Sequence, residues 1–169
     1  MKHLFFGTLL TMAAFATSAA ELSGSLGATS QGGLTARVGL GVEWEKSWLR
    51  SDTGRLTGYW DAGYTYWEAG DAAGSAHSLS FSPVFVYEFA GGEIKPFIEA
   101  GIGLAFFSNT KVGDQNLGSA FNFEDRIGVG LKIGDKQRVG IRAVHYSNAG
   151  IKQPNDGIES FALFYSHQI

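Results

Sequence analysis

Three side chains near the C-terminal end of the chain could together break an ester. His145 and Ser147 are two residues apart in an alternating, strand-like run, and Glu159 stands at the start of the next run. Residues two apart on a strand point to the same face. A hydroxyl is a weak nucleophile until a base takes its proton, and a carboxylate orients an imidazole base and stabilises its protonated form. These residue types predict acyl transfer by a serine, a histidine base and an orienting acid.

Residue parity places the three side chains on the apolar face of their strands. Around His145 and Ser147, and again around Glu159, the odd-numbered positions are mostly apolar. Asp125 is the one charged residue on the apolar face of the preceding run, and the turn that joins the runs sets it opposite His145 or Ser147. Each polar residue alone would most simply belong to the rim of a sheet. Their convergence from three strands favours a site.

Eight alternating segments must hold these groups in place. Turn residues separate the segments, and several have the ~9–11 residues that a tilted strand needs to cross a bilayer. The segments are Leu22–Ser30, Leu34–Lys46, Arg55–Trp67, Ser78–Phe89, Ile94–Phe107, Ser119–Ile133, Arg138–Asn148 and Gly157–Gln168.

The sixth segment indicates which face meets lipid. Its odd positions are almost all apolar, whereas Glu124, Arg126 and Lys132 share the other face. A soluble barrel would turn the apolar face inward, and periodicity alone does not separate the two arrangements. The three charged residues suit an interior network better than a lipid face. We therefore expect an all-β fold, an eight-stranded antiparallel transmembrane β-barrel of the outer-membrane type.

The N-terminus has the pattern of a secretory signal. Lys2 precedes a short apolar run, and Ser18-Ala19-Ala20 is a small-residue cleavage site. The apolar run is too short for a membrane-spanning helix, which needs ~20 residues. We expect a signal peptide over residues 1–20. We expect residues 21–169 to form a β-barrel enzyme domain in the bacterial outer membrane.

Composition excludes several other classes of function. The 24 glycines, 14% aromatic and 17% charged residues fit a sheet that meets lipid. With a net charge of −3 and no basic run, nucleic-acid binding is not expected. The chain has no cysteine and only four histidines, so we expect no metal site and no cofactor. The absence of a Gly-x-Ser-x-Gly motif excludes an α/β-hydrolase.

An even number of strands places both termini at the periplasmic side, with longer loops outside. The triad would then lie near the external rim, level with the outer leaflet. Residues 47–54 are long for a periplasmic turn and residues 31–33 are short for an external loop. The expected periplasmic turns are Ala90–Glu93 and Gly134–Gln137, and the expected external loops are Glu68–His77, Ser108–Gly118 and Ala149–Asp156.

The stretch from Arg142 to Ser160, with its His-x-Ser-Asn pair followed by Asn-Asp-Gly-Ile-Glu, resembles the outer-membrane lipid A 3-O-deacylase family. The resemblance implies hydrolysis of the ester-linked 3-hydroxyacyl chain at the 3-position of lipid A. It implies that Ser147 is the nucleophile, His145 the base and Glu159 the orienting acid. It further implies that Asn155 and the Gly150 amide stabilise the oxyanion, with Asn148 beside them. From its position opposite the His145–Ser147 pair, we expect Asp125 to support the reaction without being a member of the triad.

Two other functions remain open. One is a different outer-membrane acyl hydrolase, such as a phospholipase, which would use the same ester chemistry. The other is a structural or adhesive barrel without activity, whose external loops would bind partners. For the deacylase, the expected partners are lipopolysaccharide and the outer membrane, and a homodimer is left open.

Overall fold

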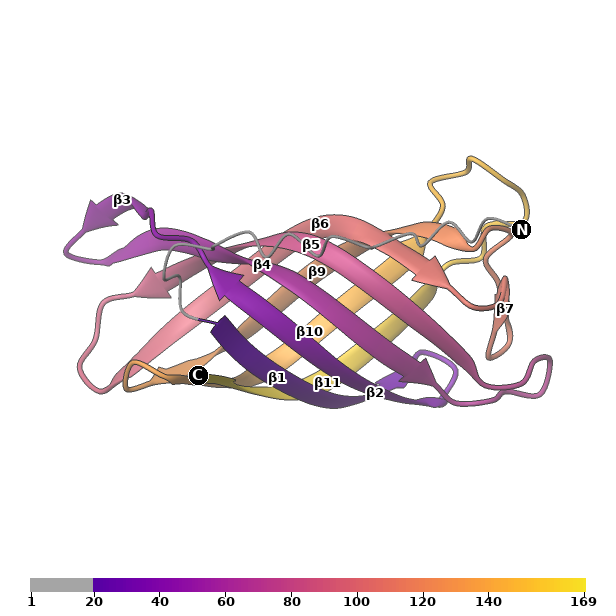
Figure 1. Ribbon diagram of the computed structural model, residues 1–169, viewed down its shortest axis with the longest axis horizontal. Helices are drawn as coiled ribbons and strands as arrows, with labels where there is room; N and C mark the ends of the chain where they lie inside the picture. The colour runs from indigo at the N-terminus through magenta and orange to yellow at the C-terminus, as the bar shows by residue number, and fades with distance from the viewer. Residues whose placement is uncertain (1–19) are drawn as a thin grey trace, which may run out of the picture.

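The computed structural model describes residues 20–169, and these form a closed antiparallel β-barrel. Figure 1 shows that the long strands, which form the wall, are tilted relative to the long axis of the barrel. The expected eight-stranded barrel is confirmed. Its eight long strands are β1 (Ala20–Thr29), β2 (Leu34–Glu43), β4 (Gly54–Trp67), β5 (Ala76–Phe89), β6 (Ile94–Phe107), β9 (Phe121–Ile133), β10 (Gln137–Ser147) and β11 (Ile158–Gln168).

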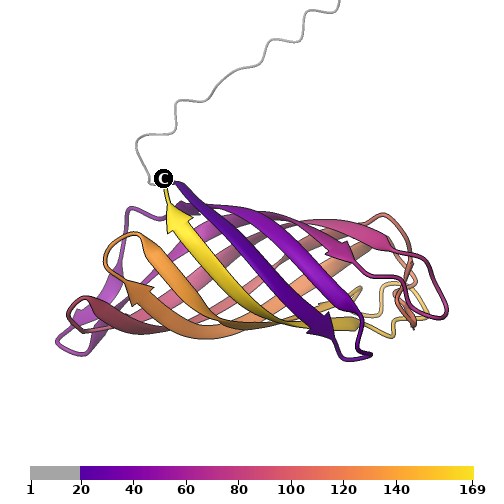
Figure 2. The ribbon, with the colours of Figure 1, turned by 90° about the horizontal axis from the view of Figure 1, so that it is seen from below.

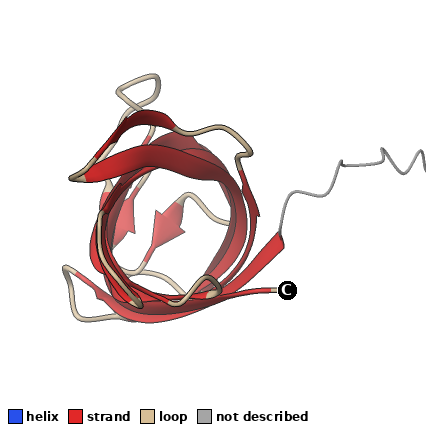
Figure 3. Cartoon of the chain, turned by 90° about the vertical axis from the view of Figure 1, so that its left-hand side faces the viewer, coloured by secondary structure: helices blue, strands red, loops and turns tan. Residues whose placement is uncertain are grey.

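The barrel closes because its first strand pairs with its last. β1 lies between β2 and β11, and the pairing of β2 with β4 completes the ring. Figure 3, seen along the barrel, shows the closed circle of strands. In Figure 2 the indigo β1 lies beside the yellow β11. Within residues 20–169, closure leaves none of the eight long strands as a sheet edge, which a strand surrounded by lipid requires.

The two ends of the barrel differ. The end with the segments 68–75, 108–120 and 148–157 is here called the loop end. The opposite end, with the short connections 90–93 and 134–136 and the C-terminus, is called the turn end (Figure 1). Among residues 20–169 no helix is long and apolar enough to cross a membrane.

Side chains fill the barrel in alternation, as the sequence predicts. On β9, Glu124 and Arg126 are buried, whereas Ile127 and Val129 are exposed on the outer wall. Inside, the guanidinium of Arg126 binds Asp61 at 2.7 Å and Glu124 at 2.6 Å, and Arg37 also binds Asp61. The interior is therefore a packed polar network, and the apolar face is the outer one.

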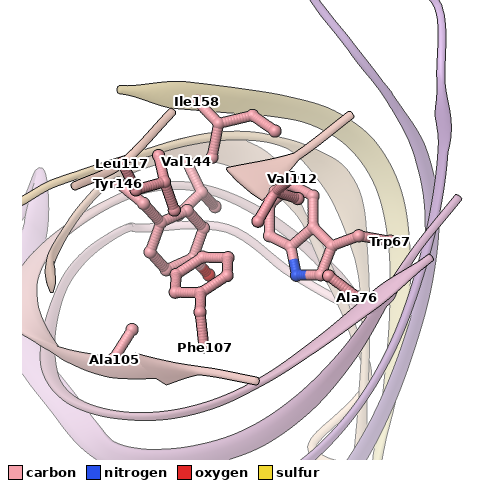
Figure 4. Close-up of a cluster of buried hydrophobic side chains, with 9 residues drawn as sticks. All are labelled: Trp67, Ala76, Ala105, Phe107, Val112, Leu117, Val144, Tyr146 and Ile158. Carbon is pink, nitrogen blue, oxygen red and sulfur yellow. The ribbon is translucent and has the colours of Figure 1, made fainter. Parts of the chain in front are cut away.

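An apolar cluster closes the interior near the loop end. Trp67 contacts Phe107 and Tyr146 through tilted and edge-on ring packing (Figure 4). Val112 and Leu117 come from the loop between β6 and β9 and are fully buried in the same cluster. The loop end is thus fixed to the barrel by packing, and this gives the neighbouring site a rigid support.

Several details differ from the expectations. Residues 47–54, predicted as a turn, include β3 (Trp48–Ser51), which pairs with β4 and extends the wall at the turn end. The predicted loop 108–118 contains a small hairpin, β7 (Lys111–Val112) and β8 (Gln115–Asn116). The expected signal peptide lies outside the described residues except for Ala20, which begins β1.

Candidate active site

The outer wall carries the three expected site residues at the loop end. Val144 and Tyr146 on β10 are buried in the barrel, so His145 between them faces outward. Ser147 is the last residue of β10 and has the same parity. On β11, Ile158 and Ser160 are buried, which turns Glu159 outward as well.

His145 and Glu159 form a hydrogen-bonded pair. They are direct cross-strand partners, and His145 Nδ1 lies 2.8 Å from Glu159 Oε1. Their side chains are 40% and 36% exposed, so the pair is open to the surroundings of the outer wall. With Nδ1 engaged by the carboxylate, Nε2 is the ring nitrogen that remains to accept a proton.

Ser147 lies one strand repeat beyond His145 on the same face. Among residues 20–169, no hydrogen bond joins its hydroxyl to the imidazole. Positions two apart on a strand are separated by about 6.6 Å of rise, so the two side chains must lean together to meet. Catalytic hydrogen bonds are often open in a free enzyme and close around the substrate.

Gly157 leaves the space that the imidazole of His145 occupies, a role that the sequence did not reveal. It precedes β11 with a left-handed φ of +71°, and it is buried. A Cβ at this position would lie 2.7 Å from His145 Cε1 and 3.5 Å from Nε2. The predicted strand, roughly Gly157–Gln168, agrees with β11 except that β11 begins one residue later, at Ile158. The only sequence signal was the glycine within the Asn-Asp-Gly-Ile-Glu motif.

The 148–157 loop is organised by its two asparagines. The Asn148 side chain is fully buried and bonds to Leu117 O and Lys152 O, both at 2.7 Å. The Asn155 Oδ1 accepts the backbone N–H of Asn148 at 2.8 Å. Gly150 has a φ of +77° with open space where a Cβ would stand. Asn148 therefore anchors the loop through its side chain, while Asn155 and Gly150 lie closer to the surface.

Asp125 lies across from His145, as the predicted register requires. It is exposed at one end of an outer-wall groove of about 660 Å³, which His145 and Glu159 also line. The rest of the groove is mostly apolar, with Ile127 and Phe161 among its walls. The arrangement sets a polar end, with Asp125, His145 and Glu159, beside an apolar trough on the outer wall.

Ser30 is a further neighbour that sequence reasoning missed. It lies in the short connection between β1 and β2, and its Oγ donates to Glu159 Oε2 at 2.9 Å. The two residues are 129 positions apart. No local pattern marks a serine at a hairpin tip as part of a site, and only the closure of β1 against β11 brings it there.

Comparisons with known proteins agree with this architecture. The chain is 70% identical over 147 residues to the lipid A deacylase PagL of Pseudomonas aeruginosa, covering 87% of this chain and 85% of that protein. It is 34% identical over 175 residues to the lipid A deacylase PagL of Bordetella bronchiseptica, covering 96% and 94%.

Solved structures show the same barrel. A crystal structure described as the outer membrane enzyme PagL superposes with a TM-score of 0.87 at 68% identity, covering 88% of this chain and 99% of that one. A designed transmembrane β-barrel at 9% identity, with a TM-score of 0.53, shares the fold alone. The family model for lipid A 3-O-deacylase (PagL) matches residues 30–168. This chain therefore belongs to the lipid A 3-O-deacylase family.

Proposed function

We propose that this outer-membrane ester hydrolase removes the 3-hydroxyacyl chain from the 3-position of lipid A through a triad of Ser147, His145 and Glu159. One observation carries the proposal. The hydrogen-bonded His145–Glu159 pair lines an apolar groove, and Ser147 lies two residues beyond His145 on the same outward face of the barrel. Membership in the deacylase family supports the substrate class.

The chemistry follows from the roles of the three groups. His145 Nε2 takes the proton of the Ser147 hydroxyl as its oxygen bonds to the ester carbonyl carbon. Glu159, bonded to Nδ1, stabilises the imidazolium that forms. His145 then gives the proton to the sugar oxygen as the ester bond breaks, leaving an acyl-serine. Water, deprotonated by His145, attacks the carbonyl carbon of that intermediate. His145 then returns the proton to the Ser147 oxygen as the acyl–serine bond breaks, and the 3-hydroxy fatty acid is released.

The 148–157 loop would stabilise the oxyanion. The Asn148 N–H bonds to Asn155 Oδ1 and so fixes the orientation of the amide. Within residues 20–169 Nδ2 has no hydrogen-bond acceptor, which makes it the first candidate donor. The Gly150 N–H, in a left-handed turn without a side chain, is the second candidate donor. The buried Asn148 would act by holding this loop in shape. Preorganised donors of this kind commonly contribute about 10²–10³ in rate.

A triad on the outer wall of the barrel suits the place of the ester bonds of lipid A in the membrane. The ester links of lipid A lie just below its headgroup, so an enzyme that cuts them needs a site that faces lipid. We infer that the loop end points outward from the cell, which sets the triad at the outer leaflet. We further infer that residues 1–20 are a signal peptide and that Asp125 supports the reaction from the neighbouring strand.

The decisive experiment compares two ester substrates. The purified protein in detergent would be incubated with lipid A and, separately, with a diacyl phospholipid. The products would be identified by mass spectrometry. The proposal predicts that lipid A loses one ester-linked 3-hydroxyacyl chain while the phospholipid is unchanged. Cleavage of the phospholipid alone would identify a phospholipase, and no cleavage of either lipid would indicate a non-catalytic barrel.

A further inference from the structure

We infer that Ser30, on the first loop-end hairpin, is a positioning residue for the reaction, because it fixes the carboxylate of Glu159. The inference rests on the proposed triad. The two oxygens of Glu159 have different partners: Oε1 binds His145 Nδ1 at 2.8 Å, and Oε2 accepts from Ser30 Oγ at 2.9 Å. Ser30 touches no reacting atom, so its effect must pass through Glu159.

The chain of hydrogen bonds has a direction. Gln31 Nε2 donates to Ser30 Oγ at 2.7 Å, which occupies a lone pair of that oxygen. The hydroxyl proton of Ser30 is then free to point at Glu159 Oε2. Hydrogen bonds in such a series strengthen one another, and a bond to a carboxylate is stronger than one between neutral groups.

Glu159 needs this support because of where it lies. Its side chain is about one-third exposed on the outer wall, so packing alone does not fix the plane of its carboxylate. One bond to His145 would leave the plane of the carboxylate free to turn. A second bond from Ser30 fixes that plane, and with it the direction in which the imidazole presents Nε2.

The hairpin that carries Ser30 is itself well held. Thr29 N donates to Gly33 O at 2.7 Å, Gly32 N donates to Thr29 O at 3.0 Å, and Gly33 N donates to the Thr29 hydroxyl at 3.1 Å. Thr29 also pairs with Ser160, the neighbour of Glu159. The position of Ser30 thus follows from the seam at which β1 closes the barrel on β11, and the complete site exists only after closure.

A double-mutant cycle tests the inference. We expect Ser30→Ala to lower kcat about tenfold, the scale of one hydrogen bond to a charged group, with KM unchanged because Ser30 does not line the groove. Ser30→Thr, which keeps the hydroxyl, should recover most of the rate. In a Glu159→Ala background, Ser30→Ala should change the rate less than twofold, since the residue through which it acts is gone.

Ser108→Ala is the matched control. Ser108 is another exposed hydroxyl of the loop end, and its Oγ accepts the N–H of His77 at 3.0 Å. Among residues 20–169 its hydroxyl has no hydrogen bond to the triad. Its removal should leave kcat unchanged. Heat-modifiable migration on gels would show that each variant is folded.

The outcomes separate the two levels of the argument. If Glu159→Ala retains the full rate, the triad itself is wrong. If Glu159→Ala is impaired but Ser30→Ala is fully active, or lowers the rate equally with and without Glu159, the triad stands and the positioning role of Ser30 is overturned.

Discussion

Gly157→Ala is expected to slow the enzyme far more than it destabilises the barrel. The new methyl carbon would stand 2.7 Å from His145 Cε1, whereas carbon atoms pack best at about 3.5–4.0 Å. The imidazole must therefore move by about 0.8 Å or more. Displacements near 1 Å in a catalytic group cost about 10²-fold, so we expect kcat to fall about 10- to 100-fold.

The substitution also strains the backbone, and a control variant separates this effect from the contact with His145. Alanine at the left-handed φ of Gly157 is strained by about 1–2 kcal/mol whatever its neighbours. Gly113 has a similar φ of +56°, but a Cβ there would meet no atom of residues 20–169 within 4 Å. Gly113→Ala therefore carries the backbone strain without the contact to His145, and it should retain nearly the full rate.

The assay is the initial rate of fatty acid release from lipid A in detergent, expressed per folded molecule. Heat-modifiable migration would give the folded fraction of Gly157→Ala and Gly113→Ala. Equal activity of the two folded variants would contradict a role for the Gly157–His145 contact. In that case the contact with His145 would not control the position of the base.

The remaining predictions concern other parts of the molecule. Asp125→Ala should lower activity, but less than Ser147→Ala does. A full rate in Asp125→Ala would show that Asp125 is a residue of the sheet rim without a part in the reaction. Lys152→Cys should react with a membrane-impermeant thiol reagent from outside intact cells, and labelling only after permeabilisation would reverse the proposed topology. Arg126→Ala leaves the buried Glu124 without its cation, so it should destabilise the barrel by about 3–5 kcal/mol, measured by denaturant unfolding; an unchanged midpoint would contradict this.

Much of the fold can be predicted from the alternation of apolar and polar residues along each strand. The parity of apolar residues predicts the outer wall, and the short turn between β9 and β10 fixes the register that sets Asp125 opposite His145. These features could be predicted because each depends on residues close in sequence. The β3 extension could not, since its pairing with β4 departs from regular register between Trp48 and Ser51.

The candidate site was predictable only in part, for the same physical reason. His145 and Glu159 belong to adjacent strands, so parity and one turn bring them together. Ser30 reaches Glu159 only through barrel closure, a contact that no window of sequence contains. Gly157 acts by lacking a side chain, and the space that it leaves for the imidazole is visible only once the ring is placed.

The most direct test of the central claim is the rate of 3-hydroxy fatty acid release from lipid A by purified, folded Ser147→Ala. The side chain faces outward at the end of β10, so its loss should leave insertion and heat-modifiable migration unchanged. In a serine protease, removal of the catalytic nucleophile lowers kcat by as much as about 10⁶-fold. We therefore predict release at least about 10³-fold below that of the unaltered protein. A folded Ser147→Ala protein that releases the fatty acid at a comparable rate would show that Ser147 is not the nucleophile.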